Sequence, residues 1–293
     1  MVPLLAAAFA LFVVPVLASN HFAGLTVSNS AGGVTSYTCR TQTQWNQLAS
    51  DAKGKGFNAV RILGFDCNSL DMASSAAAAA GIKVMAGIWV SDTIADSQTQ
   101  IDNDVQTFRT AYAKYGASRF VGLTIGNEVN DTPSNIMAKV TSVKASLTSS
   151  GITTFVSTVH DWVTIRDNAA FCNADFIGAN AHAFYDGNVG SNQAGSFLFN
   201  TVVPGLKNTC PGKKIYITET GWPSRGGNMG IAVASTVDEQ NAISSINCAC
   251  LTDTSISVYG FEYDDQLWKS NDNERSFGVF GKIPLSPGAL SSC

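Results

Sequence analysis

The chain has 293 residues, of which 45% are hydrophobic and 14% are charged, and its formal net charge is −4. This length and apolar content support a complete hydrophobic core and exclude a disordered or fibrous protein. Because Lys and Arg together number only 18, we expect no surface basic enough to attract a phosphate backbone, and therefore no nucleic-acid partner.

The first predicted element is a leader over residues 1–18. It is apolar almost throughout, and Val16-Leu17-Ala18 has the small-x-small pattern of a cleavage site. These features are typical of a secretory signal peptide, and a buried first helix is the weaker alternative. No second long apolar run follows, and the C-terminus lacks a hydrophobic tail. We therefore expect a secreted protein, extracellular or held in the cell wall, without a membrane span or lipid anchor.

Short β-prone runs alternate with longer helical patterns along residues 19–293, and no Pro-rich or Ser-rich linker interrupts them. The runs predict strands over 22–28, 59–64, 83–90, 120–126, 153–159, 176–181, 215–220 and 257–263. Between them lie predicted helices over 42–54, 70–80, 101–115, 135–149 and 237–250. Eight alternating units predict one α/β domain, a single (β/α)8 TIM barrel. An open doubly wound sheet is the rival, but no Gly-x-Gly-x-x-Gly turn follows the first run.

Seven cysteines, at positions 39, 67, 172, 210, 248, 250 and 293, are widely and irregularly spaced. This distribution indicates an oxidising compartment with three disulfides and one free thiol. We expect Cys39 to pair with Cys67, and Cys293 to pair with Cys248 or Cys250. The three histidines lack the spacing of metal ligands, so we expect neither a metal nor another cofactor.

Several predicted strands end in polar residues, which is where a barrel of this kind places its chemistry. The fourth ends at Asn127 and Glu128, and the seventh ends near Glu219. A lone acid at such a position is as often a helix cap or a surface group. However, the mouths of strands four and seven face each other across the barrel. Two glutamates there suit paired-carboxylate chemistry on one glycosidic bond.

The stretch IYITETGWPSRG over residues 215–226 resembles the signature of glycoside hydrolase family 17, the β-1,3-glucanases and glucanosyltransferases of plants and fungi. Further segments agree in order: DCNSL (66–70), VGLTIGNE (121–128), VHDW (159–162), FIGAN (176–180), FE (261–262), WK (268–269) and FGVF (277–280). The likeness spans nearly all of residues 19–293 and is strongest to the fungal wall enzymes. It implies that Glu219 is the nucleophile and Glu128 the general acid/base.

The chemistry of the residues leads to the same assignment. Glu128 must start protonated to donate to the leaving oxygen, so its pKa should be raised, whereas Glu219 must be ionised to attack the anomeric carbon. We expect the two carboxyl groups to lie about 5 to 5.5 Å apart, a spacing that enforces a covalent glycosyl-enzyme intermediate and retention. The predicted function is endo-acting hydrolysis of β-1,3-glucan, with glycosyl transfer to a second glucan chain as an alternative outcome.

Substrate-binding residues are predicted around this pair. Asn127 is placed to bond the sugar 2-hydroxyl. Tyr185 and Trp222, together with Phe184 and Trp162, are candidates for stacking on glucose, although core packing is an equal alternative for each. The resemblance also implies a substrate-binding role for Asn180, and a charged cluster that positions sugar hydroxyls or tunes Glu219, formed by Glu262, Asp265, Lys269 and Glu274. Isolated surface charges are the alternative for the cluster.

The sequence departs from the fungal pattern at three positions. Asp264 and His182 stand where aromatic residues are expected, and Gln266 stands where an acid is expected. The departures at Asp264 and Gln266 leave the role of the cluster after strand eight open. We interpret His182 as a structural histidine, with substrate contact as the alternative. Asn130 begins the sequon Asn-Asp-Thr, but a glycan there would crowd the site, so we expect it to be unmodified.

Two other functional classes stay open at this point. One is a glucan-binding wall protein with little activity, which the intact pair Glu128 and Glu219 disfavours. The other is a related barrel hydrolase acting on β-1,4-glucan or mannan, which the Trp-Pro-Ser run after Glu219 disfavours. In each case we expect a monomer.

Overall fold

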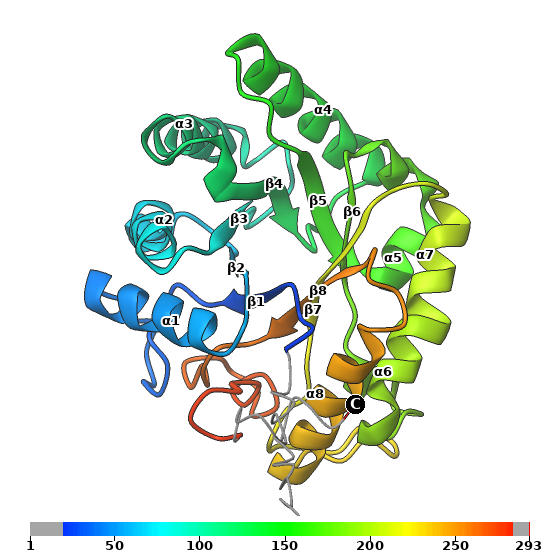
Figure 1. The fold of residues 1–293 in the computed structure, drawn as a ribbon. Coiled ribbons are helices and arrows are strands. Elements are labelled where there is room, and N and C mark those ends of the chain that lie inside the picture. Colours follow the sequence, from blue (N-terminus) through cyan, green and yellow to red (C-terminus); the bar gives the residue numbers. More distant parts are fainter. Residues whose placement is uncertain (1–19, 284–292) are drawn as a thin grey trace, which may run out of the picture.

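A computed structural model describes residues 20–283 and residue 293 of the chain, so the predicted leader over 1–18 lies outside the described residues. Within the described part, eight parallel strands pair in sequence order and close into a barrel, which confirms the (β/α)8 prediction. Figure 1 shows the strands at the centre and the helices around them. The strands are β1 (Gly24–Val27), β2 (Ala59–Ile62), β3 (Lys83–Ile88), β4 (Phe120–Asn127), β5 (Val156–Asp161), β6 (Ile177–Asn180), β7 (Ile215–Thr220) and β8 (Ser257–Phe261).

The predicted helices are present, with small shifts at their ends. Thr41 caps the first helix through a capping box with Gln44, and Thr132 caps the fourth, which starts with a proline, as the preferences of helix starts require. The longer helices are α1 (Gln42–Gly54), α2 (Ser69–Ala80), α3 (Gln98–Tyr115), α4 (Pro133–Ser149) and α8 (Thr236–Ala249).

Two parts of the prediction were wrong in detail. The fifth strand, predicted over 153–159, runs from Val156 to Asp161, because Asp161 still pairs with Asn180 of β6. Three helices were missed, namely α5 (Trp162–Asp167), α6 (Ala194–Phe197) and α7 (Val203–Thr209). Each is too short to show a clear apolar period, and a π-helical segment joins α6 to α7.

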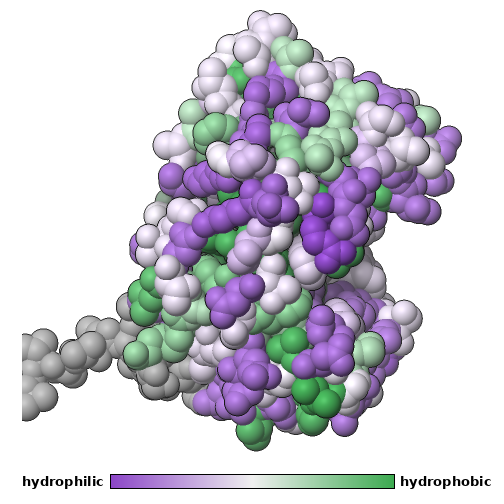
Figure 2. Space-filling model, turned by 90° about the vertical axis from the view of Figure 1, so that its right-hand side faces the viewer, coloured by the Kyte–Doolittle hydropathy of each residue, from purple (hydrophilic) through white to green (hydrophobic). Residues whose placement is uncertain are grey.

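The main core lies between the barrel and the helices, where Trp45 of α1 and Phe108 of α3 are fully buried. Figure 2 looks onto the side that α5 and α7 cover in Figure 1. Hydrophilic residues are spread over this face, and hydrophobic ones gather near its lower edge. The helices therefore turn their apolar sides inward, as amphipathic helices in a barrel do.

A second, smaller core closes the inside of the barrel towards its amino end. Phe176, Tyr216 and Tyr259 pack there with Met85 and Ala59. A Cβ atom on Gly24 would lie 2.3 Å from the Tyr259 ring, so only glycine leaves room for that ring. We call this aromatic layer the barrel floor.

Three disulfides are present in the described part of the chain. Cys39 pairs with Cys67, as expected, and Cys293 pairs with Cys248 rather than with Cys250. The third bridge joins Cys172 to Cys210, and Cys250 is free and buried. Between residues 20 and 283, no helix is both long enough and apolar enough to cross a bilayer.

Candidate active site

The position of Glu128 is set by a sharp turn at the end of β4. Gly126 and Glu128 both have left-handed backbone conformations, with φ of 80° and 54°, and a Cβ on Gly126 would lie 2.2 Å from Val129. The Glu128 amide donates to the Val159 carbonyl of β5 at 2.8 Å. A left-handed backbone at a non-glycine residue is unfavourable and is concentrated at functional sites. Here it holds the carboxylate over the mouth of the barrel.

Glu219 lies near the end of β7 and is buried, as is Arg61 of β2. Arg61 Nη1 donates to Glu219 Oε1 at 2.6 Å, and its Nη2 donates to Asn127 Oδ1 at 2.8 Å. Burial by itself raises the pKa of Glu219, but the charge of Arg61 and the nearby His182 more than offset it, so the pKa lies below its usual value. Glu219 is therefore held ionised.

Glu128 has the opposite environment. Burial, and then the charge of Glu219, raise its pKa above the usual value, although a hydrogen bond from Asn180 acts against this. Asn180 Nδ2 donates to Glu128 Oε1 at 2.9 Å. Thr218 Oγ1 donates to Asn180 Oδ1 at 2.8 Å, which fixes the orientation of the amide. The two glutamate pKa values are thus displaced in opposite directions, as expected for an acid and a nucleophile.

Both glutamates line one open cleft of about 500 Å³ at the carboxyl ends of the strands. Its wall combines rings with hydrogen-bonding groups, a composition suited to a sugar. The Tyr185 hydroxyl donates to Glu274 across the rim. Other lining residues include Asp161, Trp162, Asn180, His182, Phe261 and Phe277.

The structure brings most of the predicted site residues together. Asn180, Tyr185 and Glu274 line the cleft with the two glutamates. Asn127 sits within the network just described. Lys269 Nζ lies 3.0 Å from Glu262 Oε1 and 3.8 Å from Glu274 Oε2, so it joins a buried acid to one at the cleft.

Glu262 is buried beneath the cleft surface, next to Lys269. It is 1% exposed and does not line the cleft. Burial raises its pKa to about 7, against the lowering effect of Lys269. Glu262 therefore pairs with Lys269, an arrangement that fits the predicted tuning of Glu219 better than direct contact with substrate.

Two predicted binding residues lie away from the cleft. Trp222 is fully buried, its indole nitrogen donates to the Val233 carbonyl at 2.8 Å, and its ring packs edge-on against Phe184. Its faces are thus occupied by the core, so the prediction that it stacks on glucose was wrong. Asp265 accepts from Lys282 and from the Gly278 amide, at 2.8 and 2.9 Å, and so it ties down a loop.

The sequence interpretation missed Arg61. The available signal was a charged residue inside the otherwise apolar strand Ala59–Ile62, because a buried charge needs a partner. His182, interpreted as structural, lines the cleft with Nε2 3.7 Å from Glu219 Oε2. Its Nδ1 is buried without a hydrogen-bond partner in the described residues.

The departures after β8 form a network of their own. Asp264 pairs with Arg40 at 2.5 Å, and Gln266 Nε2 donates to Asp264 Oδ1 at 2.7 Å. Gln266 Oε1 in turn accepts from the Trp268 indole at 2.8 Å. These side chains therefore set the orientation of Trp268. Across residues 20–283 and 293, no group of three or more His, Cys, Asp or Glu side chains is arranged to hold a metal ion.

Comparisons with known proteins agree with this geometry. The family model described as BtgE/BtgC glycoside hydrolase domain matches residues 24–280. The probable family 17 glucosidase SCW10 of Saccharomyces cerevisiae is 33% identical over 80% of this chain and 59% of its own length. The cell surface mannoprotein MP65 of Candida albicans is 31% identical, over 83% of this chain and 63% of its own. The chain thus spans about three fifths of the length of these relatives.

Among solved structures, the glycoside hydrolase family 17 β-1,3-glucanosyltransferase from Rhizomucor miehei has a similar fold. It superposes with a TM-score of 0.77 at 24% identity, covering 93% of this chain and 99% of its own. An active-site mutant of that enzyme in complex with laminaritriose superposes with a TM-score of 0.73 at 25% identity, covering 88% and 92%. Together, the family model and the family 17 relative from yeast confirm the resemblance to family 17 that the sequence motifs indicated, and the solved structures show the same fold.

Proposed function

The chain belongs to the BtgE/BtgC glycoside hydrolase family, and from this membership we propose that it cleaves internal bonds of β-1,3-glucan with retention of configuration. One observation carries the proposal. Glu128 and Glu219 line the same cleft, and their pKa values are displaced in opposite directions. A protonated and an ionised carboxyl group beside one bond are the requirement for double-displacement glycoside cleavage.

In the proposed reaction, Glu219 attacks the anomeric carbon while Glu128 gives its proton to the departing glycosidic oxygen. A glycosyl ester on Glu219 results. Glu128, now ionised, takes a proton from the incoming acceptor, which attacks the same carbon and releases Glu219. Arg61 keeps Glu219 ionised at the start, and Asn180 stabilises Glu128 after its proton has left. The carboxyl separation of about 5 to 5.5 Å stays a prediction.

The substrate assignment rests on the cleft and on the relatives. Trp162 and Tyr185 offer ring surface for the apolar face of glucose, and Asn180 and Glu274 offer groups for its hydroxyls. The Rhizomucor miehei relative is a β-1,3-glucanosyltransferase seen with laminaritriose. The acceptor in this chain is therefore water or the hydroxyl of a second glucan, which makes both hydrolysis and chain transfer part of the proposal.

We further propose that the protein is a secreted monomer whose catalytic domain is residues 19–293. Its proposed place of action is the cell wall. Three disulfides favour an oxidising compartment. The SCW10 relative is a probable family 17 glucosidase, and MP65 is a cell surface mannoprotein. Size-exclusion chromatography with light scattering tests the monomer, and N-terminal sequencing of the secreted protein tests cleavage after residue 18.

The test of the activity is incubation with laminarin, cellulose and mannan. We expect oligosaccharides to be released from laminarin, with the β-anomer appearing first in the proton NMR spectrum. An initial α-anomer would exclude retention. Release of oligosaccharides from cellulose or mannan in preference to laminarin would overturn the proposed substrate. Binding of laminarin without any cleavage would favour a wall protein that has lost activity.

A further inference from the structure

A second hollow, of about 350 Å³, lies at the barrel mouth on the β1–β3 side. Its walls come from residues that follow β1, β2 and β3 and from the loop after β8, so it opens on the same face as the catalytic cleft. We call it the aromatic niche, and its lining residues include Asn29, Tyr37, Gly64, Asp66, Trp89 and Trp268.

Three aromatic side chains form the walls of the niche. Trp89 is 47% exposed and Tyr37 is 46% exposed, which is high for side chains of their size. The Tyr37 and Trp268 rings meet edge to face at 4.9 Å between centroids. Large exposed rings gathered in one hollow indicate a binding surface, and rings suit the apolar faces of a sugar better than a charged ligand.

The floor of the niche is held in place by Asn29. Asn29 is 5% exposed, and its Nδ2 donates to the Gly64 carbonyl at 2.9 Å and to Asp66 Oδ1 at 2.6 Å. These two donor bonds fix the Asn29 side chain and hold the residues after β2 at the base of the niche.

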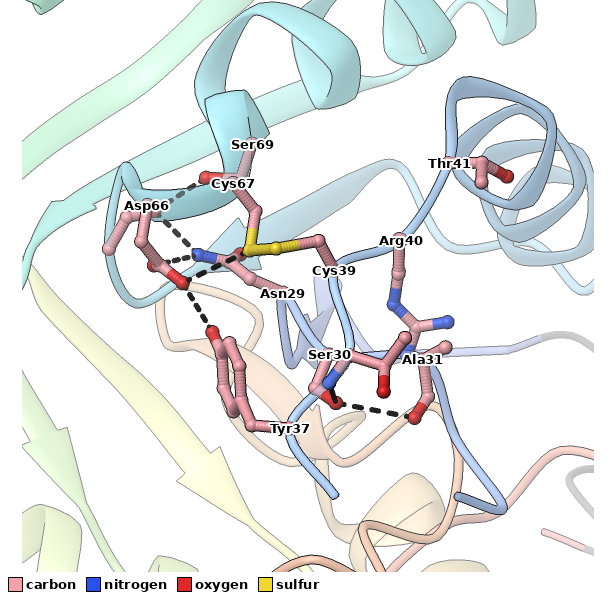
Figure 3. Close-up of a disulfide and its surroundings, with 12 residues drawn as sticks. Asn29, Ser30, Ala31, Tyr37, Cys39, Arg40, Thr41, Asp66, Cys67 and Ser69 are labelled. Carbon is pink, nitrogen blue, oxygen red and sulfur yellow. Dashed lines mark hydrogen bonds between the residues drawn. A yellow bond between two sulfur atoms is a disulfide. The ribbon is translucent and has the colours of Figure 1, made fainter. Parts of the chain in front are cut away.

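The niche is held in shape by its surroundings, as Figure 3 shows for one side. The Cys39–Cys67 disulfide ties the Tyr37 loop to Asp66, and the Tyr37 hydroxyl donates to Asp66 Oδ2 at 2.5 Å. Gln266 orients Trp268 through the bond described above. Gly64 keeps the floor open, because a Cβ there would lie 3.1 Å from the Trp89 Cβ.

The niche adjoins the catalytic cleft through two consecutive residues. Trp268 lines the niche, and Lys269 after it lies 3.8 Å from Glu274, which lines the cleft. A chain seated over Glu128 and Glu219 and extending towards β8 therefore reaches Trp268.

We propose that the aromatic niche binds a glucosyl unit of the glucan chain at a distance from the bond that is cleaved. The identity of the chain rests on the proposed function, while the niche itself rests on the contacts above. Oligosaccharides long enough to reach the niche gain affinity from it, and short ones that fill only the catalytic cleft do not. The niche thus makes the protein select long chains.

The experiment measures dissociation constants by titration calorimetry in a Glu219→Gln background, where turnover does not interfere. The probes are laminaribiose and laminarihexaose. Trp89→Ala removes a ring that is already half-exposed, and Trp89→Phe restores an aromatic face. Phe155→Ala is the matched control, because Phe155 is 53% exposed and directly precedes β5, at the opposite end of the barrel.

We expect Trp89→Ala to weaken laminarihexaose binding about tenfold, the effect of losing one good aromatic contact, and to leave laminaribiose binding unchanged. Trp89→Phe should recover much of the loss, and Phe155→Ala should change neither constant. The proposal is overturned if Trp89→Ala leaves the dissociation constant of laminarihexaose unchanged, or if it weakens the binding of both sugars equally. The proposed function fails separately, if the wild-type protein does not cleave laminarin.

Discussion

The barrel mouth and the layer under α8 each bury a glutamate, and they treat it in opposite ways. Glu219 has Arg61 Nη1 at 2.6 Å, whereas Glu239 of α8 has Lys282 Nζ at 3.5 Å and accepts no hydrogen bond within the described residues. Burial is the largest influence on both. The cationic partners offset it for Glu219, whose pKa falls. They do not for Glu239, whose pKa rises to about 8.

The difference teaches that burial alone does not make a reactive carboxylate. A buried acid stays ionised where a cation donates a hydrogen bond to it directly and other donors also stabilise the ionised form. Arg61 meets this condition at the mouth because its Nη1 donates to Glu219 while its Nη2 donates to Asn127. Lys282 divides its contacts between Ser224, Asp265 and the Ser276 carbonyl as well, and is left farther from Glu239.

The largest effect should come from removing either carboxylate at the mouth. Glu219→Gln and Glu128→Gln should each lower turnover of laminari-oligosaccharides by about 10⁴-fold or more, because each removes a bond-making group. Circular dichroism and thermal unfolding should be near those of the wild type. Glu239→Gln is the matched control and should keep full activity. An active Glu219→Gln protein would remove that residue from the mechanism.

Replacing Arg61 should have the next largest effect. In Arg61→Met, burial acts on Glu219 without its main opposing charge, so the pKa of Glu219 rises and less of it is ionised. We expect kcat to fall and the acid limb of the pH profile to move to higher pH. Arg61→Lys should be intermediate, because a lysine lacks the second donor arm that reaches Asn127. If the acid limb stayed at the same pH in these variants, Arg61 would not control the ionisation of Glu219.

The basic limb of the pH profile provides a smaller test. Activity needs Glu219 ionised and Glu128 protonated, so it should fall below the lowered pKa of Glu219 and above the raised pKa of Glu128. Asn180 donates to Glu128 and favours its ionised form. Asn180→Ala should therefore raise the pKa of Glu128 further and move the basic limb to higher pH. A shift to lower pH would contradict the arrangement seen here.

The smallest effect on activity, and a clear one on stability, should come from Glu239→Gln. The pKa of Glu239 in the folded protein, about 8, lies above its ordinary value of 4.5. The wild type should therefore be most stable below pH 4.5, as far as this group is concerned, and lose a few kcal/mol as the pH rises through 8.

Urea unfolding at pH 5 and pH 9 measures this loss. The Gln variant should lose less stability than the wild type between the two pH values. Equal losses in the two proteins would show that Glu239 ionises in the folded state without cost. Glu262, whose pKa is raised to about 7, contributes in the same direction and remains in both proteins.

The sequence predicts the barrel and the acid pair because both depend on local patterns. Apolar runs that end in polar residues mark the strands and their mouths; Glu128 directly follows one such strand and Glu219 lies near the end of another. Trp222 shows the limit. It lies within the most specific motif of the chain, yet its ring is in the core, because the direction of a side chain after a strand depends on loops that pack later in the fold.

Features that converge only when the barrel closes were beyond the sequence. Arg61 and Glu219 belong to β2 and β7, and nothing near either residue indicates the other. The aromatic niche joins Tyr37, Trp89 and Trp268 from three separate loops in the same way. Even the departures Asp264 and Gln266, which the sequence marks as unusual, gain a meaning only from their bonds to Arg40 and Trp268.

The barrel floor also limits how a polymer can move. Phe176, Tyr216 and Tyr259 fill the interior beneath the mouth. The barrel therefore has no channel along its axis through which a polymer could pass. Under the proposed function, a glucan strand therefore binds only across the cleft at the mouth and cannot pass along the barrel axis. Because that cleft is open and does not enclose the strand, we expect the strand to dissociate after a cleavage event, so that successive cuts on one polymer are independent of each other.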